Sequence, residues 1–334
     1  MRAVFRTLSP AGPGGRLSIF IFHRVLPGPD PMVNDVPSAA AFGELCQWLA
    51  AWFNVLPLDR AAELLAQGVL PERAAAITFD DGYQDNRTVA MPILQRHRLT
   101  ATFFIATDYL NGGCMWNDVV AESVRQCATP VLDLSGLATG AAPLGRYAVA
   151  DWAQKRQAAQ QITGAVKYLG PEVRRQVVAE IARLTGARVP TELMMTTEQV
   201  RQLAQAGMQV GAHTATHPIL AKLQREAAKA DIARSKQALE GILQREVSLF
   251  AYPNGKPGTD YLPETVQVVR ECGFKTAVTT AWGAAGRGAD PLQLPRFTPW
   301  DTTRLRFGIR VARNLYGARR RAQPGSAARQ IVGS

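Results

Sequence analysis

Short apolar runs that alternate with helical stretches are the feature of this chain that most restricts its fold. Residues 17–22, 74–79 and 101–106 are almost continuously apolar and of strand length, whereas residues 40–52 carry apolar side chains at helical spacing. The alternation continues with strands expected at 208–212, 248–252, 276–279 and 294–297, and helices at 83–97, 197–206 and 223–243. Apolar strands separated by helices predict a parallel sheet covered by helices. In such α/β folds the chemistry lies on the loops that follow the carboxyl ends of the strands.

Residues 111–196 interrupt this alternation. Residues 134–143 are rich in Gly, Ala and Pro, and a charged run with helical character follows over 149–184. We therefore expect a mostly helical insertion at about 111–196, within a domain that spans 16–300. Trp116, Asn117 and Asp118 at its start either line a cleft or serve as a packing tryptophan and a helix N-cap. A basic helix and tail are expected over 301–334.

The positive charge of the chain is concentrated at its C-terminal end. The net charge is +11, but residues 302–334 contain eight arginines and no acidic residue, so the remainder carries only +3. The body of the chain also lacks a basic stripe with interleaved aromatic residues, which argues against nucleic acid as a partner. Apolar residues at helical spacing over 302–316 predict either a basic amphipathic helix on an anionic membrane surface or a helix that packs against the domain and closes it.

The N-terminal segment and the cysteines bear on the compartment. The first apolar run spans only six residues, too few for a signal peptide, and no stretch is long enough to span a membrane. The four cysteines show no regular spacing, which fits a reducing compartment. We expect a cytoplasmic protein, placed at the inner face of the membrane if the basic helix binds lipid.

Two aspartates follow the second apolar run, in the sequence Thr-Phe-Asp-Asp-Gly. Side chains of adjacent residues in an extended segment point to opposite sides, so Asp80 and Asp81 can serve different purposes after a tight turn at Gly82. Alone, this sequence is equally typical of a solvated turn. Two histidines at the end of another predicted strand favour a functional role for these aspartates.

His213 and His217 lie four residues apart in His-Thr-Ala-Thr-His, directly after the apolar run 208–212. On one helical turn this spacing places both rings on the same side. Two histidines and one carboxylate form a three-ligand set with open positions for water. We predict that Asp81, His213 and His217 bind a divalent metal, with Asp80 as the neighbouring base. Such an ion lowers the pKa of bound water from about 15.7 toward 7.

These motifs resemble those of the polysaccharide deacetylases, the family 4 carbohydrate esterases with NodB homology. The resemblance rests on the segments at 78–82 (TFDDG), 213–217 (HTATH) and 250–255 (FAYPNG), which occur in the family's order. It covers about residues 16–299 and leaves the insertion unmatched. It implies a distorted (β/α)7 barrel that removes N-acetyl groups from amino sugars. It also implies Asp80 as general base and Asp81, His213 and His217 as ligands of a divalent metal, for which we expect Zn²⁺.

Two departures from the family pattern concern the base and the acid. Members commonly have an arginine that orients the base at the position of Ala251; Arg296 is a candidate replacement, or else a surface residue at a strand end. The usual acid histidine near the end of the domain is missing, because no histidine follows His217. His23, after the first strand, resembles the acid of a branch that includes deacetylases of secreted poly-N-acetylglucosamine. In a closed barrel the first and last strands are neighbours, so a histidine from either end of the domain can reach the same active site.

The resulting expectation is metal-dependent deacetylation of a polysaccharide, an oligosaccharide or a lipid-linked glycan, as in exopolysaccharide biosynthesis. Asp80 acts as base and His23 as acid, and the backbone N–H of Asn254, in the turn after Tyr252, stabilises the oxyanion. Asn254, Tyr252 and Arg296 are the expected oxyanion- and substrate-binding residues. The alternatives are a hydrolase of another acyl or formyl amide or of an ester, and a relative without activity that binds carbohydrate.

Overall fold

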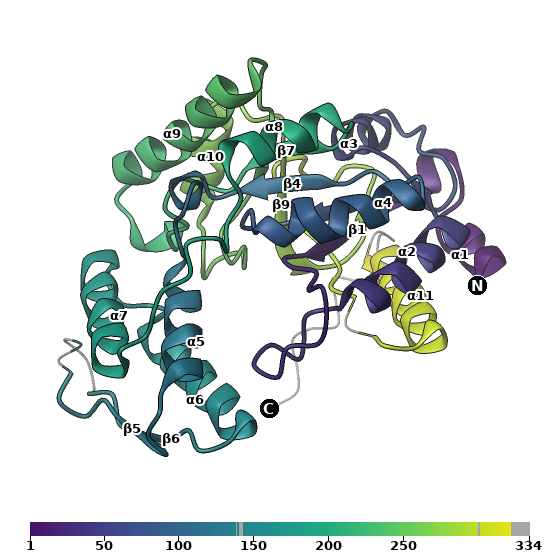
Figure 1. Cartoon of the computed structure of the whole chain (residues 1–334). Helices are drawn as coiled ribbons and strands as arrows, with labels where there is room; N and C mark the ends of the chain where they lie inside the picture. The colour runs from purple at the N-terminus through teal and green to yellow at the C-terminus, as the bar shows by residue number, and fades with distance from the viewer. Residues whose placement is uncertain (138, 140–142, 300, 322–334) are drawn as a thin grey trace, which may run out of the picture.

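The computed structural model describes residues 1–137, 139, 143–299 and 301–321. Seven parallel strands form a barrel (Figure 1). In their order around it they are β1 (Arg16–Phe22), β3 (Ala74–Phe79), β4 (Thr102–Ile105), β7 (Gln209–Ala212), β8 (Leu249–Ala251), β9 (Thr276–Trp282) and β11 (Leu294–Arg296). The ring closes after β11, where the N–H of Phe297 donates to Ile19 and its carbonyl accepts from Ile21. The predicted (β/α)7 barrel is confirmed.

Helices surround this barrel and fill the connections between its strands. They are α2 (Ala39–Trp52), α3 (Leu58–Gln67), α4 (Met91–Arg96), α8 (Thr197–Gln205), α9 (Arg225–Leu243) and α10 (Pro263–Glu271). The helix expected over 83–97 is present: helical residues begin at Gln84, continue through a wide turn over Asn86–Ala90 and run into α4. Sequence reasoning missed α3, α10 and two short strands beside the ring, β2 (Asn54–Val55) and β10 (Ala285–Gly286).

Alternation along the strands sorts side chains between two apolar layers. In β3, Ala75, Ile77 and Phe79 pack in the larger cluster with residues of the outer helices. Ala74 and Ala76 instead belong to a second cluster, which joins inward-facing residues of β1, β4, β8, β9 and β11 to apolar residues of α3. Because side chains alternate with a period of two, the next positions on the inner side of β3 are 78 and 80. Polar side chains at those positions therefore enter the barrel where the strand ends.

The predicted insertion forms a separate lobe beside the barrel (Figure 1). It consists of α5 (Trp116–Gln126), a hairpin of β5 (Val131–Asp133) and β6 (Arg146–Ala148), α6 (Trp152–Val166) and α7 (Pro171–Thr185). Apolar residues of the three helices form a core of their own, which includes Val124, Ile162 and Ile181. The insertion is thus mostly helical, as expected, although the hairpin was not foreseen.

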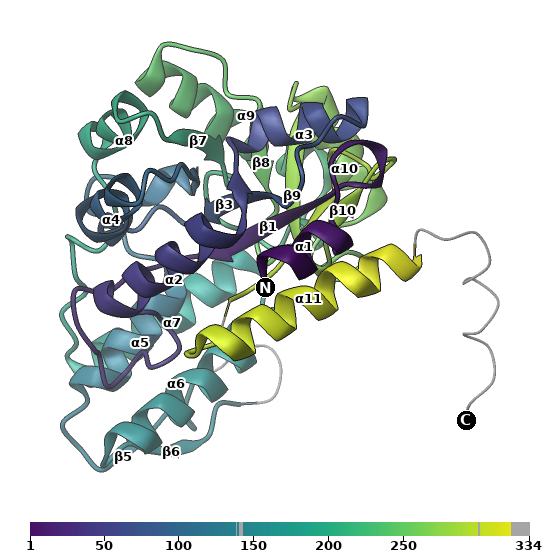
Figure 2. The ribbon, with the colours of Figure 1, turned by 90° about the vertical axis from the view of Figure 1, so that its right-hand side faces the viewer.

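The two ends of the described chain pack against each other on the barrel. Helix α1 (Arg2–Leu8), which sequence reasoning missed, lies beside α11 (Arg304–Arg321) (Figure 2). The predicted tail beyond residue 321 lies outside the described residues. Phe307, Val311 and Leu315 of α11 are fully buried in the large apolar cluster. Within the described part of the chain, no helix has the length and apolar character needed to cross a membrane.

Candidate metal centre and active site

The turn after β3 separates the two adjacent aspartates. Asp80 continues the inward side of the strand, and its N–H donates to the carbonyl of Phe22 on β1. Asp81 has a φ of 79° and Gly82 a φ of 91°, so both adopt the left-handed region in which glycine is favoured and other residues are strained. This reversal turns the carboxylate of Asp81 away from that of Asp80. The separation that the sequence predicted is therefore built into the backbone.

The two histidines lie in the loop after β7, where the sequence placed them, and this loop is irregular and not a helical turn. Thr214 and His217 have φ values of 63° and 51°, which do not occur inside a right-handed helix. Asp231 of α9 holds the loop: its carboxylate accepts the N–H of Ala215 at 2.7 Å and the hydroxyl of Thr216 at 2.6 Å. The two rings still meet, with centroids 4.8 Å apart.

Asp81, His213 and His217 converge as predicted and fit a divalent cation. Oδ1 of Asp81 lies 3.4 Å from Nε2 of each histidine, and the three ligand atoms lie within 4.8 Å of one another. Nδ1 of His213 is 2.8 Å from the carbonyl oxygen of Ala251, so this nitrogen carries the proton and Nε2 presents its lone pair. Oδ1 of Asp81 is buried without a hydrogen-bond partner, which is costly unless a cation binds there.

The electrostatics of the three residues also suit a cation. Burial lowers the pKa of His217 to about 4, so its ring is neutral and can act as a ligand. Burial would raise the pKa of Asp81, but the two neighbouring histidines, His213 and His217, hold it well below the usual range. For His213, burial is outweighed by the charges of Asp80 and Asp81, which raise its pKa. Two carboxylates thus attract positive charge to the place where a metal would bind.

Arg296 lies beside Asp80 and not at the surface. Its two terminal nitrogens donate to the two carboxylate oxygens of Asp80 at 2.7 Å each, and its Nε donates to the carbonyl of Thr279 at 2.8 Å. Arg296 is only 1% exposed. Burial would raise the pKa of Asp80, but the guanidinium of Arg296, together with His213 and His23, lowers it below the usual carboxyl value. Asp80 is therefore an ionised, oriented carboxylate.

His23 lines the cavity beside this centre, and Asn254 contacts Thr280, which lines the same cavity. His23 follows β1, is exposed, and lines the same cavity as Asp81; its backbone carbonyl accepts a hydrogen bond from Nδ2 of Asn86 at 2.8 Å. Asn254 has a φ of 57°, and the carbonyl of this residue accepts the hydroxyl of Thr280. Its backbone N–H donates to no other group among the described residues. That N–H is free to bind an anionic oxygen.

Tyr252 does not contact the cavity, contrary to our prediction. Its side chain is 0% exposed and stacks on Tyr261 with ring centroids 4.0 Å apart. Its hydroxyl donates to the carbonyl of Leu292 at 3.0 Å. The ring is large and apolar, and it is buried in the core below the turn, where it supports the loop that carries Asn254. A substrate does not reach it.

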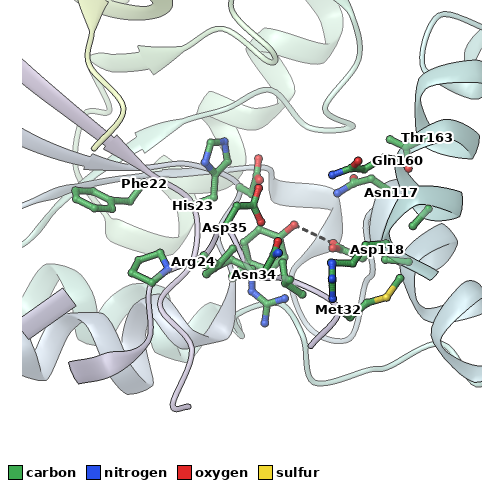
Figure 3. Close-up of a pocket in the computed structure, with 18 of the residues that line it drawn as sticks. Phe22, His23, Arg24, Met32, Asn34, Asp35, Asn117, Asp118, Gln160 and Thr163 are labelled. Carbon is green, nitrogen blue, oxygen red and sulfur yellow. Dashed lines mark hydrogen bonds between the residues drawn. The ribbon is translucent and has the colours of Figure 1, made fainter. Parts of the chain in front are cut away.

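A cavity of about 540 Å³ lies between the barrel and the insertion (Figure 3). His23 and Asp81 line it from the barrel, and Asn117 and Asp118 of α5 line it from the insertion. This outcome favours the cleft interpretation of the segment at 116–118 over an N-cap, since the residue that caps α5 is Met115. Trp116 itself packs under Arg174, whose guanidinium carbon is 4.9 Å from the ring centroid.

Sequence reasoning missed a polar network at the edge of this cavity. The hydroxyl of Tyr83 donates to Asp118 at 2.9 Å, and Arg24 lies over the Tyr83 ring while it pairs with Asp85 at 2.8 Å. Burial raises the pKa of Asp118 to about 7, although the charge of Arg24 and the hydrogen bond from Tyr83 oppose this shift. The available signal in the sequence was position: Arg24 follows His23, and Tyr83 and Asp85 lie within three residues of Gly82.

Comparison with known proteins identifies the family of this chain. A model of the polysaccharide deacetylase family matches residues 67–129 and 149–277, more than half of the chain. The match runs through most of the insertion and omits residues 130–148, so our expectation that the whole insertion would be unmatched was wrong.

Individual relatives are distant in sequence. YxkH of Bacillus subtilis (strain 168), whose name assigns it to the polysaccharide deacetylases, is 22% identical over 287 residues, 85% of this chain and 70% of that protein. The structure of IcaB from Ammonifex degensii has 20% identity and a TM-score of 0.57, covering 92% of this chain and 98% of that one. The Streptococcus pyogenes deacetylase PplD in complex with acetate has 18% identity and a TM-score of 0.56, covering 85% and 92%. Because the family model matches more than half of its length, this chain belongs to the polysaccharide deacetylase family.

Proposed function

We propose that this chain is a metal-dependent hydrolase that removes N-acetyl groups from amino sugars of a polysaccharide, an oligosaccharide or a lipid-linked glycan. Membership of the family supports a deacetylase that acts on carbohydrate. The observation that carries the finer proposal is the buried set of Asp81, His213 and His217 next to the ion pair of Asp80 and Arg296. It supplies a cation site, which reaches the cavity through Asp81, and an oriented base in the adjacent position of the chain.

The chemistry is divided between the cation and the chain. A divalent cation, for which we propose Zn²⁺, supplies a Lewis acid that polarises the acyl carbonyl and makes water more acidic. Asp80 accepts a proton from the attacking water, while Arg296 fixes the orientation of the carboxylate and keeps it ionised. The oxygen of that water forms a bond to the acyl carbon. The carbon–nitrogen bond then breaks, and acetate and an amine are released.

Two further residues act on the developing charges. The free N–H of Asn254 donates a hydrogen bond to the carbonyl oxygen as it becomes negative. The imidazolium of His23 donates a proton to the leaving nitrogen, which would otherwise depart as an unstable amide anion. The exposure of His23 to the cavity gives it access to both substrate and solvent protons.

Acetate release from a panel of substrates tests this proposal. The panel contains N-acetylated oligosaccharides, N-acetylated polymers, lipid-linked sugars, and formyl amide and ester analogues. We expect acetate from an N-acetylated saccharide, loss of activity after chelation, and recovery with Zn²⁺. Preferential cleavage of a formyl amide or an ester would favour another acyl hydrolase. No release from any substrate in the presence of metal would favour a carbohydrate-binding relative without activity.

We also propose that α11 binds an anionic membrane surface, at the inner face of the membrane if the protein is cytoplasmic. The side of α11 opposite its buried face is apolar where a solvent-facing helix is normally polar. Leu305, Ile309 and Tyr316 lie on this side and are 67%, 40% and 54% exposed. Arg306 and Arg313 flank them, are exposed, and form no ion pair with a described residue. We call these five residues the outer face of α11.

The charge of the outer face favours a lipid surface over other occupants. Arginines next to exposed apolar and aromatic side chains suit the headgroup region of an anionic bilayer. A second copy of this chain would bring like charges together. Residues 322–334 contain only two large apolar residues, Ile331 and Val332, which are too few to cover the outer face of α11. Asp301, just before α11, lines a cavity that shares Pro299 with the proposed active-site cavity, so membrane contact would bring lipid-linked glycans near it.

Co-sedimentation of the full chain with vesicles decides this point. We expect binding to vesicles that contain phosphatidylglycerol, little binding to pure phosphatidylcholine, and loss of binding when Leu305 and Ile309 are replaced by Asn. Leu184→Asn is the matched control, because Leu184 is also an exposed leucine but lies on α7. Equal sedimentation of both variants, or a dimer that Leu305→Asn disrupts in the absence of lipid, would contradict membrane binding.

A further inference from the structure

The insertion presents three polar side chains to the proposed reaction centre. Asn117 of α5 and Gln160 and Thr163 of α6 line the cavity opposite His23 (Figure 3). Gln160 and Thr163 are three residues apart and therefore lie on one side of α6. We call these three residues the insertion wall. Its groups come from two helices that pack against each other, and they face the same space as the metal ligand Asp81.

The insertion wall has free hydrogen-bonding capacity and no charge. The side chains of Asn117, Gln160 and Thr163 donate to and accept from no other side chain or backbone group among the described residues. Two amides and a hydroxyl offer both donors and acceptors, which is the chemistry that matches the hydroxyl groups of a neutral sugar.

Charged side chains of both signs line the cavity, namely Arg24, Arg125 and Arg156, and Asp35, Asp81, Asp118 and Glu122. Arg24 pairs with Asp85 at 2.8 Å, and the guanidinium of Arg125 donates to both carboxylate oxygens of Asp30 at 2.9 and 2.7 Å. Arg125 also pairs with Glu122 at 2.9 Å. Three arginines and four carboxylates among the lining residues give the cavity no strong excess of either sign, which favours a neutral ligand.

The insertion wall is held at a fixed distance from the barrel. The Arg125–Asp30 pair joins α5 to the loop after β1, and the hydrogen bond from Tyr83 to Asp118 joins the metal-bearing loop to the same helix. The insertion also has its own apolar core. Groups that are positioned before a ligand arrives lose little entropy on binding, so weak individual hydrogen bonds can still contribute to affinity.

From this geometry we infer that the insertion wall binds a second sugar unit, adjacent to the unit that is deacetylated. The inference rests on the proposed function, because it takes the acyl group of one unit to lie at Asp81 and Asp80. The insertion would thus set the minimum length of the substrate.

The test compares substrate lengths in matched variants. Acetate release is measured with N-acetylglucosamine and its β-linked dimer and tetramer, using the zinc-loaded full chain. Gln160→Ala and Asn117→Ala remove parts of the insertion wall. Gln161→Ala is the control, because Gln161 is the exposed neighbour on α6 that does not line the cavity. Binding of the same three sugars to each protein is measured by calorimetry.

We expect the tetramer to be the better substrate. Each wall variant should raise KM for the tetramer by about twofold to tenfold, the effect of one lost hydrogen bond, with kcat and monomer activity unchanged. Gln161→Ala should match the unaltered protein. Equal effects on monomer and tetramer, or none, would overturn the inference while leaving the proposed deacetylation intact. If no sugar is hydrolysed, the proposed function fails. The insertion wall would still be supported if the tetramer binds and its binding is weakened in Gln160→Ala but not in Gln161→Ala. Absence of tetramer binding would overturn it.

Discussion

Arg296 and Asp80 are separated by 216 residues in sequence, yet two nitrogens of one contact two oxygens of the other at 2.7 Å. The pair is buried, with side-chain exposures of 0% and 3%. Both residues lie on the inner side of their strands, where the apolar interior of the barrel gives way to the cavity. Bidentate geometry fixes the plane of the carboxylate in a way that a single point charge does not.

Replacement of Arg296 by Lys tests the orienting role of this pair. Lysine keeps the positive charge but cannot form two parallel hydrogen bonds, so the carboxylate of Asp80 loses its fixed orientation. We expect kcat to fall by at least about tenfold, up to the 10²–10⁴-fold that general-base catalysis contributes, with metal content retained. Arg296→Met should also reduce stability by about 3–5 kcal/mol, because it leaves a buried charge unpaired. Wild-type kcat in Arg296→Lys would exclude the role.

Binding of zinc to the folded chain should stabilise it. A cation that binds only the folded state adds about 2.7 kcal/mol to the free energy of unfolding at a concentration of 100 times Kd. We expect this gain in urea titrations of the chelated protein with and without Zn²⁺, and its loss in His217→Ala. His97→Ala is the control, since His97 ends α4 and is not part of the metal set. An equal gain in His217→Ala would place the metal elsewhere.

The raised pKa of Asp118 predicts that the free energy of unfolding depends on pH. Below about pH 4 the carboxyl group is protonated in both the folded and the unfolded chain. Between its ordinary value of 3.8 and about 7 the unfolded chain loses this proton while the folded chain retains it. The free energy of unfolding therefore decreases as pH rises through this window.

Asp118→Asn removes this dependence while its amide oxygen can still accept the hydroxyl of Tyr83. We expect the difference in stability between the variant and the unaltered protein to grow from pH 4 to pH 7 and then remain constant. Thermal unfolding at several pH values in the same buffer system measures it. A difference that does not vary with pH would show that Asp118 is not buried as its contacts indicate.

The two sides of α11 should respond differently to truncation. Phe307 is fully buried and stacks on Trp52 with centroids 5.9 Å apart, so Phe307→Ala should cost about 3–5 kcal/mol of stability. Leu305→Ala on the outer face should change stability by less than about 0.5 kcal/mol. Urea denaturation of the two variants provides the comparison. Similar costs would mean that α11 does not pack on the barrel through Phe307.

The sequence was sufficient to predict the features that depend on local pattern. β3 matches the predicted run 74–79 because its apolar residues are continuous and end at the paired aspartates. The convergence of Asp81 with His213 and His217 followed from placing both motifs at strand ends. Arg296 could only be proposed, because its partner depends on the order of strands around the closed ring, which no local pattern encodes.

The errors arose where tertiary contacts override local preference. Tyr252 was assigned to the cavity from its place in a motif, but its stacking on Tyr261 buries it. The loop that carries the histidine pair was expected, but its shape was not, because that shape depends on Asp231 from a helix further along the chain. The antiparallel pair of β5 and β6 was missed because both strands are only three residues long, too short to show an alternating pattern.

The separate roles of Asp80 and the metal ligands are the central claim, and one measurement on two variants tests them. Zinc content and acetate release are determined together for Asp80→Asn and His213→Ala, with an N-acetylated oligosaccharide as substrate. We predict that Asp80→Asn retains one zinc ion per chain but loses turnover, and that His213→Ala loses both. Full activity in Asp80→Asn, or undiminished zinc binding in His213→Ala, would contradict the account.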